Sequence, residues 1–133
     1  MYRYANDEVK QSIGLSEKAI NMIIEAEHAS RPVIDIGCIQ VSPLLFDYKT
    51  CEDHLKVSYK TLLINVLTEL GGTVEEGINI VADRFHVNKD NKEDVSSCVR
   101  FFMSDYIRHR YAYENHKLED MPTLEYILQY ATE

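Results

Sequence analysis

The sequence predicts an all-α fold, a compact bundle of about five to six helices in one domain that spans residues 1–133. Apolar residues recur at intervals of three and four over most of the chain, which is the period of a helix with one buried face. Residues that favour helix ends, such as Thr73 and the pair Gly71-Gly72, separate these stretches. The length of 133 residues and the hydrophobic content of 45% suit a single domain with its own core.

The two most regular helices are predicted at residues 53–70 and 73–86. The pair Gly71-Gly72 ends the first helix. Thr73 begins the second helix, with Glu76 as its partner in a capping box. Because only this short turn separates them, we expect the two helices to pack as an antiparallel or steeply angled pair.

Three further helices are predicted at residues 16–30, 90–111 and 122–131. Asp90 is the expected N-cap of the second of these, with Glu93 as its capping partner. Its buried side is expected to include the following residues: Val95, Cys98, Val99, Phe102, Met103 and Tyr106. The proline at the start of the last helix is tolerated in a first turn.

Residues 33–41 are ambiguous. Their β-branched content is typical of a strand. A strand needs a partner, however, and no second convincing run is found elsewhere in the chain. We therefore expect a short buried helix or an irregular apolar segment that ends at Pro43, with a short extended segment as the alternative.

The charge balance bounds the class of partner. Lysine and arginine number 14 against 22 aspartates and glutamates, so the net charge is −8. Nucleic acids and acidic membrane surfaces attract basic proteins, so we expect neither direct nucleic-acid binding nor membrane association. No apolar run reaches the ~20 residues of a membrane span, and the polar N-terminus does not resemble a secretory leader. A basic protein partner is the expectation that remains.

The cysteines predict a reducing environment. Cys38, Cys51 and Cys98 are odd in number and have no short spacing, which suits neither a disulfide framework nor a zinc site. We expect reduced thiols, with Cys38 and Cys98 buried, and a cytoplasmic location. The single Glu25/His28 pair has helical spacing, but a di-metal site needs that pair twice. We therefore expect neither a metal nor a cofactor.

Arg110 and His116, near the end of the predicted helix 90–111, are the only candidate catalytic residues. Their spacing resembles the Arg-(four to six residues)-His motif of HEPN-domain ribonucleases, which are small all-helical proteins. This resemblance implies a homodimer in which Arg110 holds the phosphate of RNA and His116 moves the proton. The alternative interpretation is a helix end whose cations complement the helix dipole.

Tyrosine usage favours protein binding. The chain has 9 tyrosines and no tryptophan, and the tyrosines concentrate in its last third, beside arginines. Both residue types are enriched at interface hot spots. With no catalytic motif apart from Arg110/His116, we predict a non-enzymatic, acidic module that caps a basic protein, as an immunity protein or antitoxin caps a nuclease toxin. A HEPN-like ribonuclease and a non-catalytic subunit or adaptor of a larger assembly are the alternatives.

The expected partner-binding residues are carboxylates near the predicted turns and tyrosines near the end of the helix 90–111. They are Glu75, Glu76, Asp83, Asp90, Glu93, Asp94, Tyr111, Tyr113, Glu114, Glu119 and Asp120.

Overall fold

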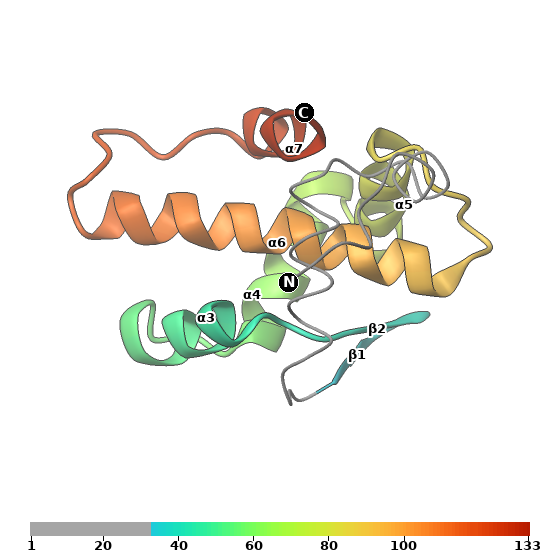
Figure 1. Ribbon diagram of the computed structural model, residues 1–133, viewed down its shortest axis with the longest axis horizontal. Coiled ribbons are helices and arrows are strands. Elements are labelled where there is room, and N and C mark those ends of the chain that lie inside the picture. Colours follow the sequence, from blue (N-terminus) through green and yellow to red (C-terminus); the bar gives the residue numbers. More distant parts are fainter. Residues whose placement is uncertain (1–32) are drawn as a thin grey trace, which may run out of the picture.

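In the computed structural model, the described part of the chain comprises residues 33–133, arranged around one long helix (Figure 1). This helix, α6 (Lys92–Glu114), has 23 residues. At about 1.5 Å per residue it is about 34 Å long. α7 (Leu124–Thr132) lies on one side of α6, while α3 (Leu45–Lys49) and a short hairpin lie on the opposite side (Figure 1). The prediction of a mostly helical fold with one short extended segment is confirmed.

Two further helices complete the bundle. α4 (Tyr59–Gly71) is joined to α5 (Val74–Arg84) by a tight turn at Gly72, whose φ is +86°. The Thr73 side chain accepts a hydrogen bond from the Glu76 N–H at 3.1 Å, as one half of the predicted capping box requires. The two helices pack against each other, and α5 also packs against α6 and α7.

The predicted start of the first of these helices is wrong. The sequence pattern placed it at residue 53, whereas α4 begins at Tyr59. Ser58 has an extended backbone, and its side chain accepts a hydrogen bond from the Thr61 N–H at 3.1 Å. This cap fixes the start of α4. Residues 53 and 54 belong instead to η1 (Thr50–His54), a π-helical turn that continues directly from α3, and residues 55–57 are not helical.

The caps of α6 and α7 also differ by a residue or two from the prediction. Asn91, and not Asp90, caps α6 by accepting a hydrogen bond from the Asp94 N–H at 3.2 Å. Thr123 caps α7, so Pro122 precedes the cap and does not lie in the first turn. Neighbouring Asx, Ser and Thr residues compete for the same role, and spacing alone does not select between them. The helix predicted at 16–30, with the Glu25/His28 pair, lies outside the described residues.

Residues 33–41 form a β-hairpin. The preferred expectation of a short helix or irregular segment is therefore wrong, and its alternative, a short extended segment, is confirmed. β1 (Ile34–Ile36) pairs antiparallel with β2 (Ile39–Val41), and Ile36 faces Ile39 across the turn. The partner strand lies within the same segment, because a turn of two residues suffices to reverse the chain. Gly37 begins that turn with a φ of +70°, which glycine adopts at low cost.

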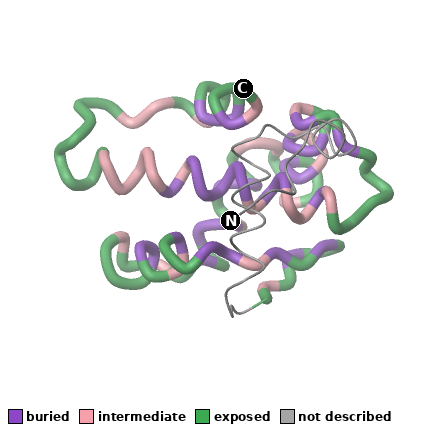
Figure 2. Tube along the Cα trace, in the orientation of Figure 1, coloured by how far each residue is buried: buried purple, intermediate pink, exposed green. Residues whose placement is uncertain are grey.

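The core is built around the middle of α6. Residues 101–105 are all buried, so this part of the helix is enclosed on every side, whereas both ends of α6 carry half-exposed and exposed residues (Figure 2). Five residues predicted on the buried side are confirmed there, Val95, Cys98, Val99, Phe102 and Met103. Tyr106, the sixth, is only half-buried. The described helices include none that is long and apolar enough to cross a membrane.

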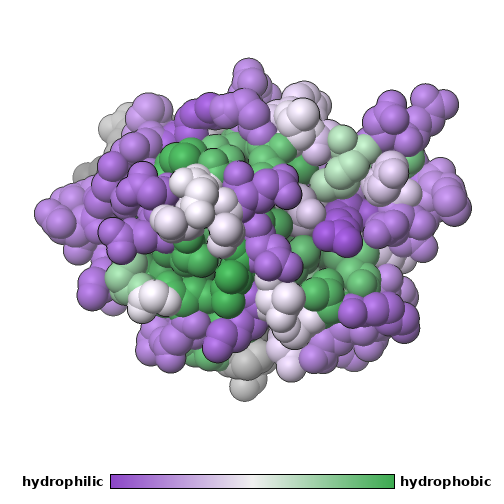
Figure 3. All heavy atoms as spheres, turned by 180° about the vertical axis from the view of Figure 1, so that it is seen from behind, coloured by the Kyte–Doolittle hydropathy of each residue, from purple (hydrophilic) through white to green (hydrophobic). Residues whose placement is uncertain are grey.

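The opposite face of the molecule carries apolar side chains near its centre, bordered by hydrophilic ones (Figure 3). A groove of about 420 Å³ lies between the hairpin and the α4–α5 pair. Ile36, Ile64, Val74 and Ile78 supply most of its apolar lining, with Lys60 and Glu75 among the polar residues.

The α4–α5 pair depends on glycines that allow close backbone contact. A Cβ atom added at Gly77 would lie 2.7 Å from the carbonyl carbon of Leu67 and would overlap its oxygen. A Cβ atom at Gly71 would in turn overlap backbone atoms of Glu76 and Gly77. These contacts are to backbone, which cannot move aside as the end of a side chain can.

We therefore predict that Gly77→Ala destabilises the fold, although alanine favours a helix more than glycine does. The free energy of unfolding should fall by about 3 kcal/mol, because the two helices must separate. Urea denaturation measures this. Glu75→Ala, on the exposed side of the same helix, should change it by less than about 0.5 kcal/mol. An unchanged or higher stability of Gly77→Ala would contradict the close packing.

Candidate functional site

Helix α3 reverses the usual distribution of apolar and polar residues. Leu45 and Phe46 are 53% and 49% exposed, whereas the carboxyl group of Asp47 is completely buried. The side of the α3–η1 helix that faces the core carries Leu44, Asp47 and Cys51, which are spaced three and four residues apart. The two apolar residues between them must therefore point outward.

A buried polar contact holds α3 in this orientation. The hydroxyl of Ser104, in the enclosed part of α6, donates a hydrogen bond to Oδ2 of Asp47. Both residues are fully buried. A buried carboxyl group is tolerated only where hydrogen bonds replace its water. Rotation of α3 to bury Leu45 and Phe46 would break this contact.

The surroundings of Asp47 are also buried and polar. Burial raises the pKa of the Tyr59 hydroxyl well above its usual value, and the neighbouring Asp47 raises it further. Burial raises the pKa of the Cys51 thiol to about 12, and Asp47 again contributes. Both groups are therefore neutral at physiological pH and have a structural role.

The π-helical turn η1 carries the next part of the site. Its wider turn is closed by a hydrogen bond of 2.9 Å from the Leu55 N–H to the Thr50 carbonyl. Single π-helical turns are uncommon and occur often at functional sites. Here the turn ends at His54, whose ring contacts the ring of Tyr111 on α6.

Three aromatic rings meet on the exposed side of α3. The Tyr111 ring lies 6.2 Å from the ring of Phe46 at an interplanar angle of 82°. It lies 5.3 Å from the ring of His54 at 76°. We call Leu45, Phe46, His54 and Tyr111 the α3 patch. Tyr111 was predicted as a partner-binding residue. Its ring contacts those of Phe46 and His54, and Leu45 precedes Phe46 in α3.

Sequence reasoning missed Leu45 and Phe46, because the stretch after Pro43 was not assigned to a helix. The signal was nevertheless present in the spacing of Leu44, Asp47 and Cys51. It was obscured because one of the three inward positions holds an aspartate, which a search for apolar periodicity excludes.

Carboxylates border the α3 patch. Glu52 and Asp53 are exposed in η1, next to His54. Glu114 lies three residues after Tyr111, on the same side of α6. Its Oε2 lies 3.7 Å from Nε of Arg110. Lys49, in the last turn of α3, is a cation in the same region.

The predicted partner-binding residues divide between the two ends of α6. One group belongs to α5, the loop after it and the first turn of α6: Glu75, Glu76, Asp83, Asp90, Glu93 and Asp94. The other belongs to the last turns of α6 and the loop that follows: Tyr111, Tyr113, Glu114, Glu119 and Asp120. The ends of α6 are about 34 Å apart, so these residues do not form one continuous surface. In the first group, Asp83 already pairs with Lys89 at 2.8 Å.

Arg110 and His116, the alternative catalytic pair, both take part in contacts within the chain. Nη1 of Arg110 donates a hydrogen bond of 3.3 Å to the Tyr106 hydroxyl, and the guanidinium also lies near Glu114. His116 follows the end of α6 with a φ of +61°, and its N–H donates to the Tyr113 carbonyl at 3.1 Å.

These bonds give His116 a structural role. The N–H of Lys117 donates to the Ala112 carbonyl at 2.7 Å, which together with the bond from His116 completes a Schellman motif. His116 occupies the left-handed position that glycine usually takes in this motif. His86 has the same position after α5, with a φ of +58°.

A second aromatic group lies on the α7 side of α6. The ring of His109 contacts Tyr126 at 6.3 Å and Tyr130 at 5.4 Å, both nearly perpendicular. Nδ1 of His109 lies 2.7 Å from the Asp105 carbonyl and so carries the proton that it donates. The carboxylate beside Tyr126, on Glu125, pairs with Arg84 of α5.

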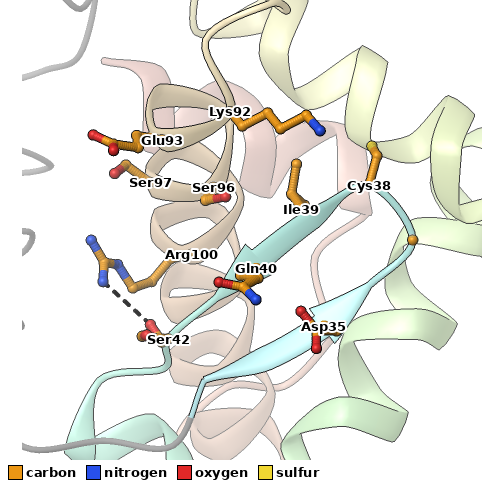
Figure 4. A pocket seen from close by; sticks show the side chains of 11 residues that line it. Asp35, Cys38, Ile39, Gln40, Ser42, Lys92, Glu93, Ser96, Ser97 and Arg100 are labelled. Atoms are coloured by element: carbon orange, nitrogen blue, oxygen red, sulfur yellow. Dashed lines mark hydrogen bonds between the residues drawn. The ribbon is translucent and has the colours of Figure 1, made fainter.

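A polar cleft of about 610 Å³ lies between the hairpin and the first turns of α6 (Figure 4). The Lys92 side chain extends toward Cys38 at the hairpin turn, whereas Arg100 points to the other side and donates to the Ser42 carbonyl at 3.4 Å (Figure 4). The two cations thus do not converge, and Glu93 offsets their charge. The cleft does not form an anion site of the kind that converging cations make.

The cysteines occupy two kinds of environment. Cys51 and Cys98 are buried, but Cys38 is exposed at the hairpin turn, which corrects the expectation that it is buried. Within residues 33–133, no cluster of three or more histidine, cysteine or carboxylate side chains is arranged to hold a metal ion.

No protein-family profile, curated protein or solved structure matches the chain. Its function must therefore be inferred from geometry and charge.

We predict that Ser104→Ala destabilises the fold, because it removes a hydrogen bond from a carboxyl group that water cannot reach. The free energy of unfolding should fall by about 1–3 kcal/mol. Chemical denaturation followed by circular dichroism measures this. Ser96→Ala, at a half-exposed position of the same helix, should have almost no effect. Equal stabilities of the two variants would show that the Asp47–Ser104 contact does not hold α3.

The thiols should differ sharply in reactivity. Burial raises the pKa values of Cys51 and Cys98 to about 12, so at pH 8 only about one molecule in ten thousand carries either thiolate. Iodoacetamide should therefore modify Cys38 alone in the native protein and all three cysteines after unfolding. Peptide mass spectrometry identifies the sites. Rapid native modification of Cys51 would contradict the packing of η1 against the core.

Proposed function

We propose that the chain is a protein-binding module that caps a basic protein partner through the α3 patch. The observation that carries this proposal is the reversed helix, in which Leu45 and Phe46 are half-exposed while Asp47 is buried. An exposed apolar residue beside a buried carboxyl group lowers the stability of a fold. Such departures from the usual distribution of residues tend to occur at functional sites.

The energetics favour a partner over solvent. Full burial of a leucine or phenylalanine side chain contributes about 1.5–3 kcal/mol. A protein partner that covers Leu45 and Phe46 would gain part of that free energy. An apolar and aromatic centre with a charged border is also the usual composition of an interface with a few dominant contacts.

Charge supports a basic partner. The net charge of −8 attracts cationic proteins over long distances and speeds their association. Glu52, Asp53 and Glu114 supply carboxylates at the border of the patch. Proteins that cleave RNA have basic surfaces that bind its phosphate groups. Carboxylates of an inhibitor can bind the same surfaces in place of the phosphates. We therefore propose a nuclease-type toxin as the partner and an immunity protein or antitoxin as the role of this chain. An adaptor in a larger assembly would use the same surface.

The three cysteines are free thiols. Together with the absence of a disulfide among the described residues, this supports our proposal that the protein acts in the reducing cytoplasm.

The partner can be identified by photocrosslinking in the native host. A photoreactive amino acid at position 45 should give a crosslinked product with one basic protein. The same amino acid at Gln129, an exposed position on α7, should give none. The identified protein and this chain are then purified, and their affinity is measured by calorimetry. An acidic partner, or equal crosslinking from both positions, would contradict the proposal.

We predict that the double variant Leu45→Ser/Phe46→Ser weakens this binding by about 100-fold, because both side chains lose their apolar contacts. The control Tyr126→Ala, at an equally exposed aromatic residue on α7, should change the affinity by less than about twofold. If the partner is a toxin, only the control should still suppress its activity on coexpression. Undiminished binding by the double variant would show that the α3 patch is not the interface.

The charge contribution is tested by association rates. Glu52→Lys should slow association and Lys49→Glu should speed it, and salt should reduce the difference. Rates that do not respond to either change would show that a basic partner is not steered to this surface.

A further inference from the structure

We propose that the α3 patch is an arginine-binding site, in which the guanidinium group of one arginine of the partner lies against the rings of Phe46, His54 and Tyr111. This inference rests on the proposed function and specifies what the basic partner presents. It predicts that an arginine, and not a lysine, is the central contact.

The arrangement of the rings supports a cation. The rings of Phe46 and His54 both stand nearly perpendicular to that of Tyr111, at 82° and 76°. In each perpendicular pair the edge of one ring meets one face of the other, so the faces of the edge-on ring are not covered by that pair. A cation that lies on a π-face is attracted by the ring quadrupole. Phe46 and His54 are exposed, so this surface is open to solvent.

The carboxylates favour a guanidinium over an ammonium group. Asp53 precedes His54 in η1, and Glu114 lies on the Tyr111 side of α6. Glu114 is already engaged by Arg110 at 3.7 Å, so Asp53 is the carboxylate beside the rings that is left for an added guanidinium. A planar guanidinium can stack on a ring and pair with a carboxylate at once, whereas a compact, strongly hydrated ammonium does this poorly.

The aromatic group around His109 provides an internal comparison. It has the same perpendicular rings, but its carboxylate Glu125 is paired with Arg84, as Glu114 is with Arg110, whereas no ion pair among the described residues engages Asp53 beside His54. We therefore expect the α3 patch, and not the α7 side, to take an added arginine.

The test uses two peptide probes of equal charge, acetyl-(Arg)4-amide and acetyl-(Lys)4-amide, at constant ionic strength. Each is titrated into the full chain, and the ring signals of His54 and Tyr111 are followed by NMR. We expect saturable shifts and a dissociation constant about threefold lower for the arginine peptide. Equal affinities, or shifts that avoid these two rings, would overturn the proposal.

Substitutions locate the site. Tyr111→Leu and His54→Lys should each remove the preference for the arginine peptide, the first by removing a ring and the second by adding a competing cation. The control Tyr126→Leu should keep the preference, and circular dichroism shows whether each variant is folded. Retention of the preference in folded His54→Lys would place arginine binding elsewhere.

The two proposals fail separately. In one outcome, the double variant at Leu45 and Phe46 no longer binds the partner that crosslinking identified, while the two peptides bind the wild type equally. That result would support the α3 patch as the interface and contradict the arginine site. If the arginine peptide binds preferentially but the partner is indifferent to that double variant, the arginine site stands and the proposed function does not.

Discussion

The hydrogen bond between Ser104 and Asp47 determines the orientation of α3, and the surface of the molecule at that end follows from it. Ser104 lies in the part of α6 that is enclosed on every side, so its position is set by the core. The carboxyl group of Asp47 must be buried to accept the hydrogen bond from Ser104. The side of α3 that carries Asp47 therefore faces the core. Leu45 and Phe46 remain outside because turning them inward would break this contact and move the carboxyl group out of its buried site.

The π-helical turn extends this effect to the aromatic rings. A regular helix after Thr50 would rotate the following side chains by about 100° per residue, but the wider turn of η1 changes that angle. His54 thereby reaches the ring of Tyr111, which already contacts Phe46. Phe46 and Tyr111 are 65 positions apart in the sequence, yet they lie in one group of rings at the surface.

Local chemistry made much of the fold predictable. The Gly71-Gly72 turn and the Thr73 cap bounded α4 and α5 because caps act within one turn of a helix. The hairpin was missed because its partner strand was sought elsewhere, although a turn of two residues places it within the same segment. Leu45 and Phe46 were missed because their exposure depends on Ser104, which lies far away in the sequence. The spacing of Leu44, Asp47 and Cys51 indicates the inward side of the helix only once Asp47 is known to be buried, and no local pattern contains the contact that buries it.

Some carboxylates of this protein stabilise the helix end at which they lie, and others do not. Their position relative to the helix dipole distinguishes the two groups. Glu75, Glu76, Glu93 and Asp94 lie in first turns, where negative charge stabilises the free N–H groups of the helix. Their abundance therefore needs no partner to explain it. Glu114 lies in the last turn of α6, and Glu52 and Asp53 lie near the end of the continuous α3–η1 helix, where the dipole disfavours negative charge. Glu114 has a structural partner in Arg110. Glu52 and Asp53, which oppose the dipole and lie next to His54, are better explained by what binds there than by the fold itself.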